Sequence, residues 1–226
     1  PTDRSGSRGI TKVYNKDELE KAVKYATKDS FEKSAIIEEY IDGNEYSCEC
    51  ITSNGKHHFL AFTKKYTTGA PNFIETGHCE PSDIKEEYQG QIKENIFKAL
   101  TALGIQNSAS HTEFKINENG EFGIIEIGAR MGGDCIGSDL VQISTGYDFI
   151  KMVIDVACGK ELDFTKVVEP QKAHIKFIFN EKDLEEMNRF KEEHPERIYR
   201  ISEMELENLG KTVDSSSRIG YYIYTE

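Results

Sequence analysis

One stretch, HTEFKINENGEFGIIEIGAR at residues 111–130, restricts this chain more than any other. Two strand-like runs flank the dipeptide Asn119-Gly120, which is the strongest short-range signal for a two-residue hairpin turn. Counting outward from that turn places Glu113 opposite Glu126 on the neighbouring strand. The sequence therefore predicts a hairpin that holds two carboxylates face to face.

The predicted register separates the hairpin into an apolar and a charged face, because side chains alternate along a strand. It pairs Phe114 with Ile125 and Thr112 with Ile127, so the apolar face is expected to pack on a core. The other face carries the two glutamates, and Arg130 as well if the strand continues.

Two directly opposed carboxylates, with Cβ atoms roughly 4.5–5.5 Å apart, destabilise a sheet. A divalent cation between their oxygens reverses that sign, and Mg²⁺ commonly takes one or two carboxylates together with substrate phosphates. Arg130 on the same face would hold an anion beside the metal. The alternative is a solvated hairpin face with scattered charges, since exposed glutamate is common.

The composition excludes several classes of protein. The chain has 226 residues, a formal net charge of −12 and a mean hydropathy of −0.58. Acidic balance disfavours a nucleic-acid or anionic-membrane partner, because phosphate contacts need clustered Lys and Arg, and no apolar run approaches the roughly 18 residues of a membrane span. The five cysteines form no C-x-x-C pair, so reduced thiols in a cytoplasmic protein fit better than a zinc site or a disulfide framework.

Strand and helix patterns mix along the chain without a regular βαβ rhythm, so we expect an α+β fold. A composition shift at 163–171 is the best candidate boundary. The expected elements are a helix at 16–28 capped by Asn15, a strand at 34–41, a hairpin at 45–63 turning at Asn54-Gly55, a long functional loop at 64–81, a helix capped by Ser82 and ending near 103, the hairpin at 108–128, a helix at 147–158 with Phe149, Ile150, Val153, Ile154 and Ala157 on one face, a strand at 173–179, a helix at 181–193, and strands near 198–201 and 220–224.

Three motifs in order make the chain resemble the ATP-grasp superfamily. PTDRSGSRG resembles its phosphate loop, whose small residues can form a backbone nest for phosphate. IIEEYIDGNEYS resembles its adenine-and-ribose segment, and HTEFKI…GIIEIGARMGGD resembles its metal-binding hairpin. Each motif alone is weak, and their order and spacing make the resemblance specific. ETGHCEP and EIGARMGGD point to the carboxylate–amine ligase branch that includes amino-acid ligases.

The resemblance implies a fold and a reaction. The fold has part of a small lid subdomain at 1–40, a large antiparallel-sheet subdomain at 41–165 and a small C-terminal subdomain at 166–226. With ATP bound between two subdomains, its γ-phosphoryl group passes to a carboxylate, an amine attacks the acyl phosphate, and ADP and phosphate leave. The implied cofactors are ATP and Mg²⁺, with Mn²⁺ as an alternative, and the partners are small carboxylates and amines such as amino acids. A homo-oligomer is left open.

The resemblance also assigns site residues by matching each motif. Those implied are Ser5, Gly6, Ser7 and Gly9 around the phosphates, Glu38 and the backbones of Glu39 and Ile41 at adenine, Glu45 at the ribose, Glu113 and Glu126 as Mg²⁺ ligands, Arg130 at the transferred phosphoryl group, and His78 and Asp134 at the substrate.

Two departures from the pattern matter. Gly128 stands where many relatives have Asn, so a side-chain metal ligand is missing. In the family, the strand that enters the phosphate loop carries a lysine that contacts the nucleotide, and this lysine is also absent. Its absence predicts an N-terminally truncated ligase fragment that does not turn over by itself. The rival interpretations are a non-catalytic nucleotide-binding or regulatory module and a purely structural α+β domain.

Overall fold

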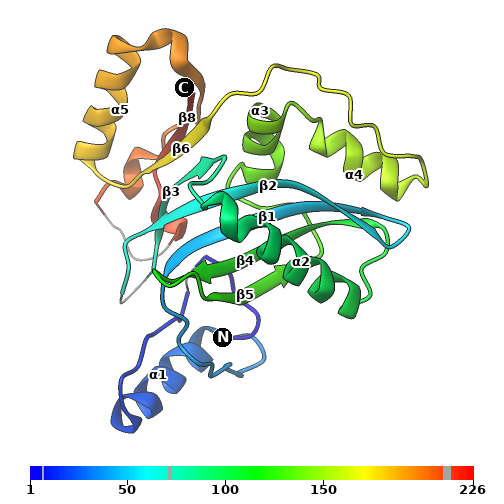
Figure 1. The fold of residues 1–226 in the computed structure, drawn as a ribbon. Helices are drawn as coiled ribbons and strands as arrows, with labels where there is room; N and C mark the ends of the chain where they lie inside the picture. The colour runs from blue at the N-terminus through cyan, green and yellow to red at the C-terminus, as the bar shows by residue number, and fades with distance from the viewer. Residues whose placement is uncertain (7, 71–72, 211–214) are drawn as a thin grey trace. The chain divides into compact units, whose positions relative to one another are not determined.

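A computed structural model describes residues 1–6, 8–70, 73–210 and 215–226, and Figure 1 shows their arrangement into elements. The described elements are α1 (Lys16–Asp29), β1 (Asn44–Ser53), β2 (Lys56–Thr67), β3 (Glu75–Glu80), α2 (Glu86–Ala102), β4 (Ser108–Ile116), β5 (Phe122–Gly128), η1 (Ile136–Leu140), α3 (Val141–Thr145), α4 (Phe149–Ala157), β6 (Ala173–Ile178), α5 (Glu181–Glu193), η2 (Pro195–Arg197), β7 (Ile198–Ile201), η3 (Leu206–Asn208), η4 (Ser215–Ser217) and β8 (Gly220–Thr225).

The chain divides into two compact units. The first unit contains residues 1–40, 66–77 and 176–223, and the second contains 41–65, 78–175 and 224–226. The three-part division expected from the sequence stays a prediction.

The second unit is built on an antiparallel sheet in which β5, β4, β1 and β2 are neighbours in that order. Alternate side chains of these strands point toward α2, which lies along one face of the sheet (Figure 1). The core on this face is apolar and aromatic. Its buried members are Tyr46, Cys48, Cys50, Phe62, Ile84, Ile92, Ile96, Leu100, Phe114 and Ile116. The side chains between them therefore belong to the opposite face.

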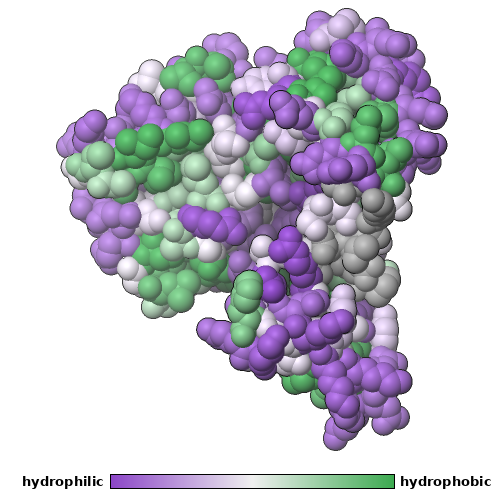
Figure 2. Space-filling view, turned by 180° about the vertical axis from the view of Figure 1, so that it is seen from behind, coloured by the Kyte–Doolittle hydropathy of each residue, from purple (hydrophilic) through white to green (hydrophobic). Residues whose placement is uncertain are grey.

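Helix α4 packs against β1 and β4 in the second unit, but with a different face from the one predicted. Phe149, Met152 and Val156 are buried, whereas Ile150 and Ile154 are 42% and 55% exposed. The helix is apolar nearly all round, so periodicity could not choose the buried face. Figure 2 shows the resulting apolar surface over this part of the unit.

The first unit contains α1, which begins as the sequence predicts. The Asn15 side chain accepts from the Glu18 backbone N–H, and the Glu18 carboxylate accepts from the Tyr14 N–H at 2.9 Å. This reciprocal arrangement satisfies N–H groups that have no partner inside the helix. The first unit also contains β7, residues 176–178 of β6 and residues 220–223 of β8, which are neighbours in the order β6, β8, β7, and it contains α5, which begins at an Asn180 cap.

Three expectations about local structure are wrong. Residues 34–41 form no strand: a strand needs a hydrogen-bonded neighbour, and within the described chain this run has no ladder, with Ile36 and Ile37 largely exposed. Helix α2 begins at Glu86 after Lys85, and Ser82 does not cap it. The expected loop at 64–81 contains the end of β2 and all of β3.

The hairpin of β4 and β5 keeps the predicted glutamate pair through two compensating differences. Residues 117–121 form a five-residue loop, so Ile116 pairs with Phe122 and the register is one residue away from the predicted one. A bulge at Ile125 then restores it, and Glu113 lies opposite Glu126 as predicted. The pairing of Phe114 with Ile125 was wrong: Phe114 pairs with Ile124, and Ile125 is 40% exposed.

None of the helices in the described residues is long and apolar enough to span a bilayer.

Candidate functional site

The sheet face opposite α2 is lined with charged side chains in register across three strands. Directly opposed residues share a face, and the register places β1 in the middle, between β4 and β2. One row contains Lys115, Glu45 and Lys65; the next contains Glu113, Ser47 and Thr63; the third contains His111, Glu49 and Ala61. Most of these polar groups are buried, so the face is a preorganised charged surface inside the second unit.

Glu113, in the middle row, contacts charged side chains of the rows on either side. Its Oε1 accepts from Lys65 Nζ at 2.6 Å and from His111 Nε2 at 3.1 Å, and its side chain is 25% exposed. Burial would raise the pKa of Glu113, but the hydrogen bond from His111 and the charge of Lys65 together hold that pKa well below its usual range. Glu113 is therefore a carboxylate anion that is still accessible from solvent.

Glu49 and His111 form a buried pair behind Glu113. His111 Nδ1 is hydrogen-bonded to Glu49 Oε1, and Glu49 Oε2 accepts from the Gly132 N–H at 3.0 Å. Burial would lower the pKa of His111, but the carboxylates of Glu49 and Glu113 outweigh it and raise that pKa to about 9.

Glu126, Gly128 and Arg130 lie along β5 and just beyond it. Glu126 and Arg130 are exposed, and Arg130 Nη1 donates to the Met131 carbonyl at 2.8 Å. A Cβ on Gly128 would meet Arg130 Cγ at 3.4 Å, which is ordinary contact.

The residues present fit a magnesium ion held by two carboxylates. Glu113 and Glu126 are hard oxygen donors on paired strands, and Glu126 is exposed. No cluster of three or more His, Cys, Asp or Glu suited to a metal occurs in the described ranges. Such a pair needs phosphate or water oxygens to complete the coordination, as Mg²⁺ at phosphate sites does. The role of the pair as metal ligands stays a prediction.

His78 and Asp134, the two predicted substrate residues, lie together in the second unit. His78 Nε2 is 3.6 Å from Asp134 Oδ2, and the His78 side chain is buried. Asp134 and Cys135 both have positive φ, 51° and 62°, immediately before the π-helical turn η1. Such strained backbone is common at functional sites, where neighbouring structure has to maintain it.

Glu80, on β3, is a fully buried carboxylate that was not among the site residues predicted from the sequence. Its oxygens accept from the Thr63 and Ser144 hydroxyls. Burial raises the pKa of Glu80 to about 7, because the two hydroxyl hydrogen bonds offset only part of the cost of an uncompensated charge.

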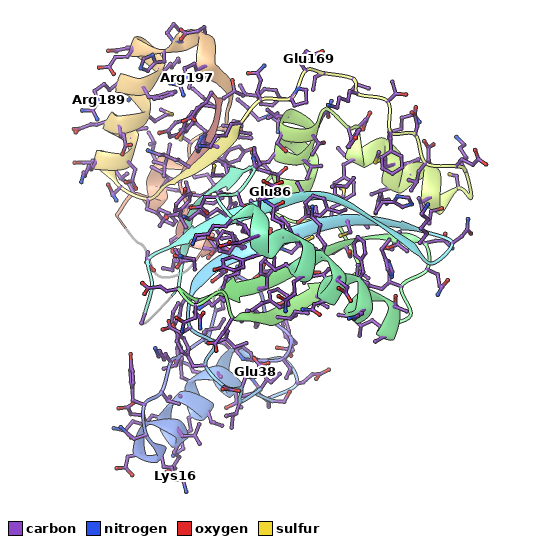
Figure 3. The ribbon with its side chains drawn as sticks, viewed as in Figure 1. Lys16, Glu38, Glu86, Glu169, Arg189 and Arg197 are labelled. Atoms are coloured by element: carbon purple, nitrogen blue, oxygen red, sulfur yellow. The ribbon has the colours of Figure 1, made fainter. Side chains whose placement is uncertain are left out.

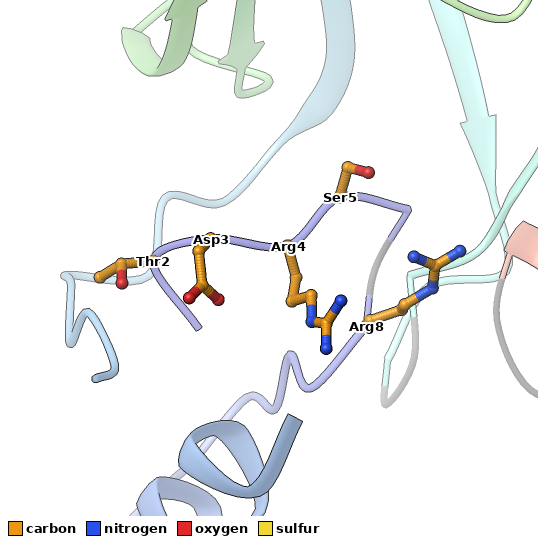
Figure 4. A pocket seen from close by; sticks show the side chains of 5 residues that line it. All are labelled: Thr2, Asp3, Arg4, Ser5 and Arg8. Carbon is orange, nitrogen blue, oxygen red and sulfur yellow. The ribbon is translucent and has the colours of Figure 1, made fainter. Parts of the chain in front are cut away.

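The predicted phosphate loop lies in the first unit and lines an open pocket of about 390 Å³ (Figure 4). Ser5 is on the pocket wall, between Arg4 and Arg8. Gly6 and Gly9 follow with φ of 69° and 70°, which glycine adopts readily. Ser7 lies outside the described residues.

The segment of the loop before Ser5 is fastened to residues 29–34. The Asp3 carboxylate accepts from the Glu32 N–H at 2.8 Å and from the Ser30 hydroxyl at 3.1 Å. The Arg4 guanidinium lies 3.7 Å from the centre of the Phe31 ring and donates to the Asp29 carbonyl. The pocket therefore carries two cationic side chains, Arg4 and Arg8, that were not among the predicted site residues.

The adenine and ribose candidates are divided between the units. Glu38, which is labelled in Figure 3, and Glu39 are exposed, and both belong to residues 1–40 of the first unit. Ile41 belongs to the second unit, where its side chain lies against Gly123. Glu45 is on the charged face, with Oε1 3.4 Å from Lys65 Nζ.

The structure therefore brings together only part of the predicted set. Glu45, Glu113 and Glu126 share the charged face, His78 and Asp134 form a separate pair, and Ser5, Gly6 and Gly9 share the loop. The sequence did not predict four charged residues of the second unit's charged face, which are Glu49, Lys65, His111 and Lys115. A signal for Glu49 was present, because polar residues 45, 47 and 49 alternate with core residues in NEYSCEC.

Comparison with known proteins agrees with the motifs. A sequence model of the ATP-grasp domain matches residues 1–139. Alanine–anticapsin ligase of Bacillus subtilis (strain 168) is 31% identical over 186 residues, which cover 72% of this chain and 39% of that protein. The chain thus spans well under half the length of this relative.

Solved structures are similar in fold. L-amino acid ligase from Bacillus licheniformis has a TM-score of 0.72 and 24% identity, covering 96% of this chain and 55% of that one. The biotin carboxylase domain of Hydrogenobacter thermophilus 2-oxoglutarate carboxylase, solved with MgADP, has a TM-score of 0.69 and 19% identity, covering 99% of this chain and 51% of that one. The motifs, the α+β fold and the match over more than half of the chain lead to one conclusion: this chain belongs to the ATP-grasp family.

Proposed function

We propose that this chain is the nucleotide- and metal-binding part of an ADP-forming carboxylate–amine ligase that joins amino acids. The observation that carries the proposal is the charged face of the second unit, where Glu113 and Glu126 are paired beside Lys65 and close in sequence to Arg130. The names of the ligase relatives support amide-bond formation between amino acids, and the MgADP complex of a neighbour in fold supports the nucleotide and the metal.

Bound Mg²⁺ would neutralise phosphate charge and align the phosphate oxygens, and Glu113 and Glu126 are the residues that would hold it. Mn²⁺ takes the same oxygen ligands and is the alternative ion for this site. Lys65, whose ammonium is already held by Glu113 and Glu45, supplies a fixed positive charge on the same face. Arg130 is exposed, so its guanidinium is available for a phosphate or carboxylate.

The phosphate loop supports the same proposal from the first unit. Gly6 and Gly9 have the positive φ found in backbone nests for anions, and Arg4 and Arg8 add positive charge to the pocket. In the reaction proposed, the chain supplies position and charge, and no side chain is required as a covalent nucleophile. The same proposal places the chain in the cytoplasm, where thiols such as those of Cys48 and Cys50 stay reduced.

The proposal is tested by thermal unfolding with ATP and ADP, with and without Mg²⁺, followed by a screen of amino-acid pairs for phosphate release by the longest available form of the protein. We expect nucleotide to raise the unfolding temperature more strongly with Mg²⁺ and release to require both an acid and an amine. Nucleotide binding without release for any pair would favour the non-catalytic module instead.

Glu45→Gln is expected to weaken ATP and ADP alike, by roughly tenfold or more. A carboxylate can accept from both ribose hydroxyls, and hydrogen bonds to a charged group contribute roughly 1.5–3 kcal/mol each. Because Glu45 is not one of the two carboxylates proposed to hold the ion, the Mg²⁺ dependence should remain. Calorimetric titration measures both affinities, and Asp42→Asn, an exposed carboxylate three residues earlier, is the matched control. Unchanged affinities for both nucleotides would remove Glu45 from the ribose site.

A further inference from the structure

We propose that Glu49 and His111 act as a positioning pair, which orients the metal ligand Glu113 and fixes the glycine-rich loop after β5 at the same time. The proposal rests on the proposed function, because it takes Glu113 to be a metal ligand. Neither residue was selected from sequence, and neither is placed in contact with the nucleotide or the metal.

The first observation is a continuous hydrogen-bonded chain. His111 uses both ring nitrogens on carboxylates, Nδ1 on Glu49 and Nε2 on Glu113 at 3.1 Å. Carboxylates accept and do not donate, so both ring nitrogens donate and the ring cannot rotate without losing a bond. The ring thereby restricts the Oε1 end of Glu113, which leaves the orientation of that carboxylate fixed before any metal arrives.

The second observation is the other oxygen of Glu49. Oε2 accepts from the Gly132 backbone N–H at 3.0 Å. A Cβ on Gly132 would lie 2.8 Å from His111 Nδ1 and 2.9 Å from Glu49 Oε1, so only glycine allows the loop to approach this closely. The loop that carries Arg130 and Asp134 is therefore fastened to the same carboxylate that holds His111.

The third observation concerns how the fold aims Glu49. Its side chain is completely buried, and the β1–β2 ladder has a bulge next to it. Bulges are frequent beside active sites, where they redirect a side chain. A buried carboxylate is costly unless its oxygens have partners, and Glu49 has the His111 ring on one oxygen and a backbone donor on the other. Both partners belong to segments that carry proposed site residues.

The pair therefore couples two functions through one side chain. A displacement of Glu49 would break its hydrogen bonds to His111 and to Gly132. Glu113 and the loop that carries Arg130 would then both lose a fixed neighbour. Arg130 is proposed to contact the transferred phosphoryl group, which ADP lacks, so the affinity for ADP in the absence of metal should not change with Glu49. This separation is the feature that a purely structural role would not produce.

The experiment titrates Mg²⁺ into protein saturated with ADP, measures the half-saturating concentration by thermal shift, and measures ADP affinity in EDTA by calorimetry. Glu49→Gln and His111→Asn should raise the half-saturating Mg²⁺ by roughly 10–100-fold, the usual effect of losing a partner behind a metal ligand. ADP affinity in EDTA should stay within about twofold of wild type, since no ligand contact is changed.

Two further variants make the result specific. His111→Gln places an amide nitrogen near the position of Nε2, keeps the donor to Glu113, and should shift the half-saturating Mg²⁺ less than His111→Asn does. Glu80→Gln changes another fully buried carboxylate that touches neither Glu113 nor His111, and should leave the Mg²⁺ dependence unchanged.

The outcomes separate this proposal from the proposed function. If Glu113→Ala loses the Mg²⁺ effect while folded Glu49→Gln and His111→Asn retain the wild-type value, the positioning pair is wrong and the metal assignment stands. If Glu113→Ala itself retains the Mg²⁺ effect, the metal assignment fails. If Glu49→Gln and both His111 variants all fail to fold, the pair is structural and the proposal is overturned.

Discussion

Alanine at Glu113 or Glu126 is expected to abolish the extra thermal stabilisation that Mg²⁺ gives to the ADP-bound protein. The two carboxylates supply the protein oxygens proposed to bind the ion. Position 128 is glycine, so β5 offers no third side-chain ligand that could replace either of them. Loss of one should move the requirement for Mg²⁺ beyond the millimolar range. The measurement is the shift in unfolding temperature with ADP across a Mg²⁺ titration.

The two variants should differ in stability without ligand, which tests the geometry independently. Removing Glu113 leaves the buried ammonium of Lys65 and the ring of His111 with one carboxylate fewer, which should destabilise the fold by about 2 kcal/mol. Glu126 is exposed, so its removal should change stability by less than about 0.5 kcal/mol. Glu118→Ala, an exposed carboxylate in the hairpin loop, is the control for both effects. A normal Mg²⁺ response in both variants would exclude the assigned metal site.

The sequence predicted this pair correctly for a reason that was only partly right. The hairpin loop is longer than Asn-Gly suggests because Asn117 organises it: its Oδ1 accepts from the N–H groups of Asn119 and Glu121. A Cβ on Gly120 would lie 2.7 Å from Tyr88 of α2, so the loop also packs on the helix. The bulge at Ile125 then restores the register. Local turn rules could not foresee either effect.

The neighbours of Glu113 were harder to predict than the glutamate pair itself. Pairing within a hairpin follows from a turn, whereas β1 and β4 are distant in sequence, and their register is set by how both strands pack on α2. Without that register, Lys65 and His111 could not be placed beside Glu113. Residues 34–41 show the opposite failure: an apolar run read as a strand has no ladder within the described chain, because β propensity depends on a neighbour to pair with.

A second large effect is expected for substitution of Glu80, and it concerns the free energy of unfolding, not ligand binding. It has no cation among its hydrogen-bond partners, which are the hydroxyls of Thr63 and Ser144, and the charged groups that face it are Glu49, which raises its pKa, and His111, which lowers it. Burial is the largest cause of the rise from 4.5 to about 7. Folding therefore favours the protonated acid, and above neutral pH the buried carboxylate costs stability.

Glu80→Gln is expected to stabilise the protein above pH 7 by about 3 kcal/mol, the free energy that corresponds to a rise in pKa of this size. In the wild type the contribution of Glu80 is fully present below the unfolded pKa of about 4.5 and is lost as pH rises through about 7. The glutamine amide can accept from one hydroxyl and donate to the other, so neither Thr63 nor Ser144 loses its partner. Urea unfolding from pH 4.5 to 8 measures the difference.

The shape of that pH dependence separates titration of Glu80 from a simple change in packing. The advantage of Glu80→Gln should be near zero at pH 4.5, grow up to about pH 7 and then stay constant, whereas a packing effect would be the same at every pH. Glu118→Gln removes an exposed carboxylate and should show no such profile. A wild type that is more stable than Glu80→Gln at pH 8 would mean that Glu80 is ionised in the fold and held by a partner charge, and would contradict the neutral buried acid inferred from its two hydroxyl neighbours.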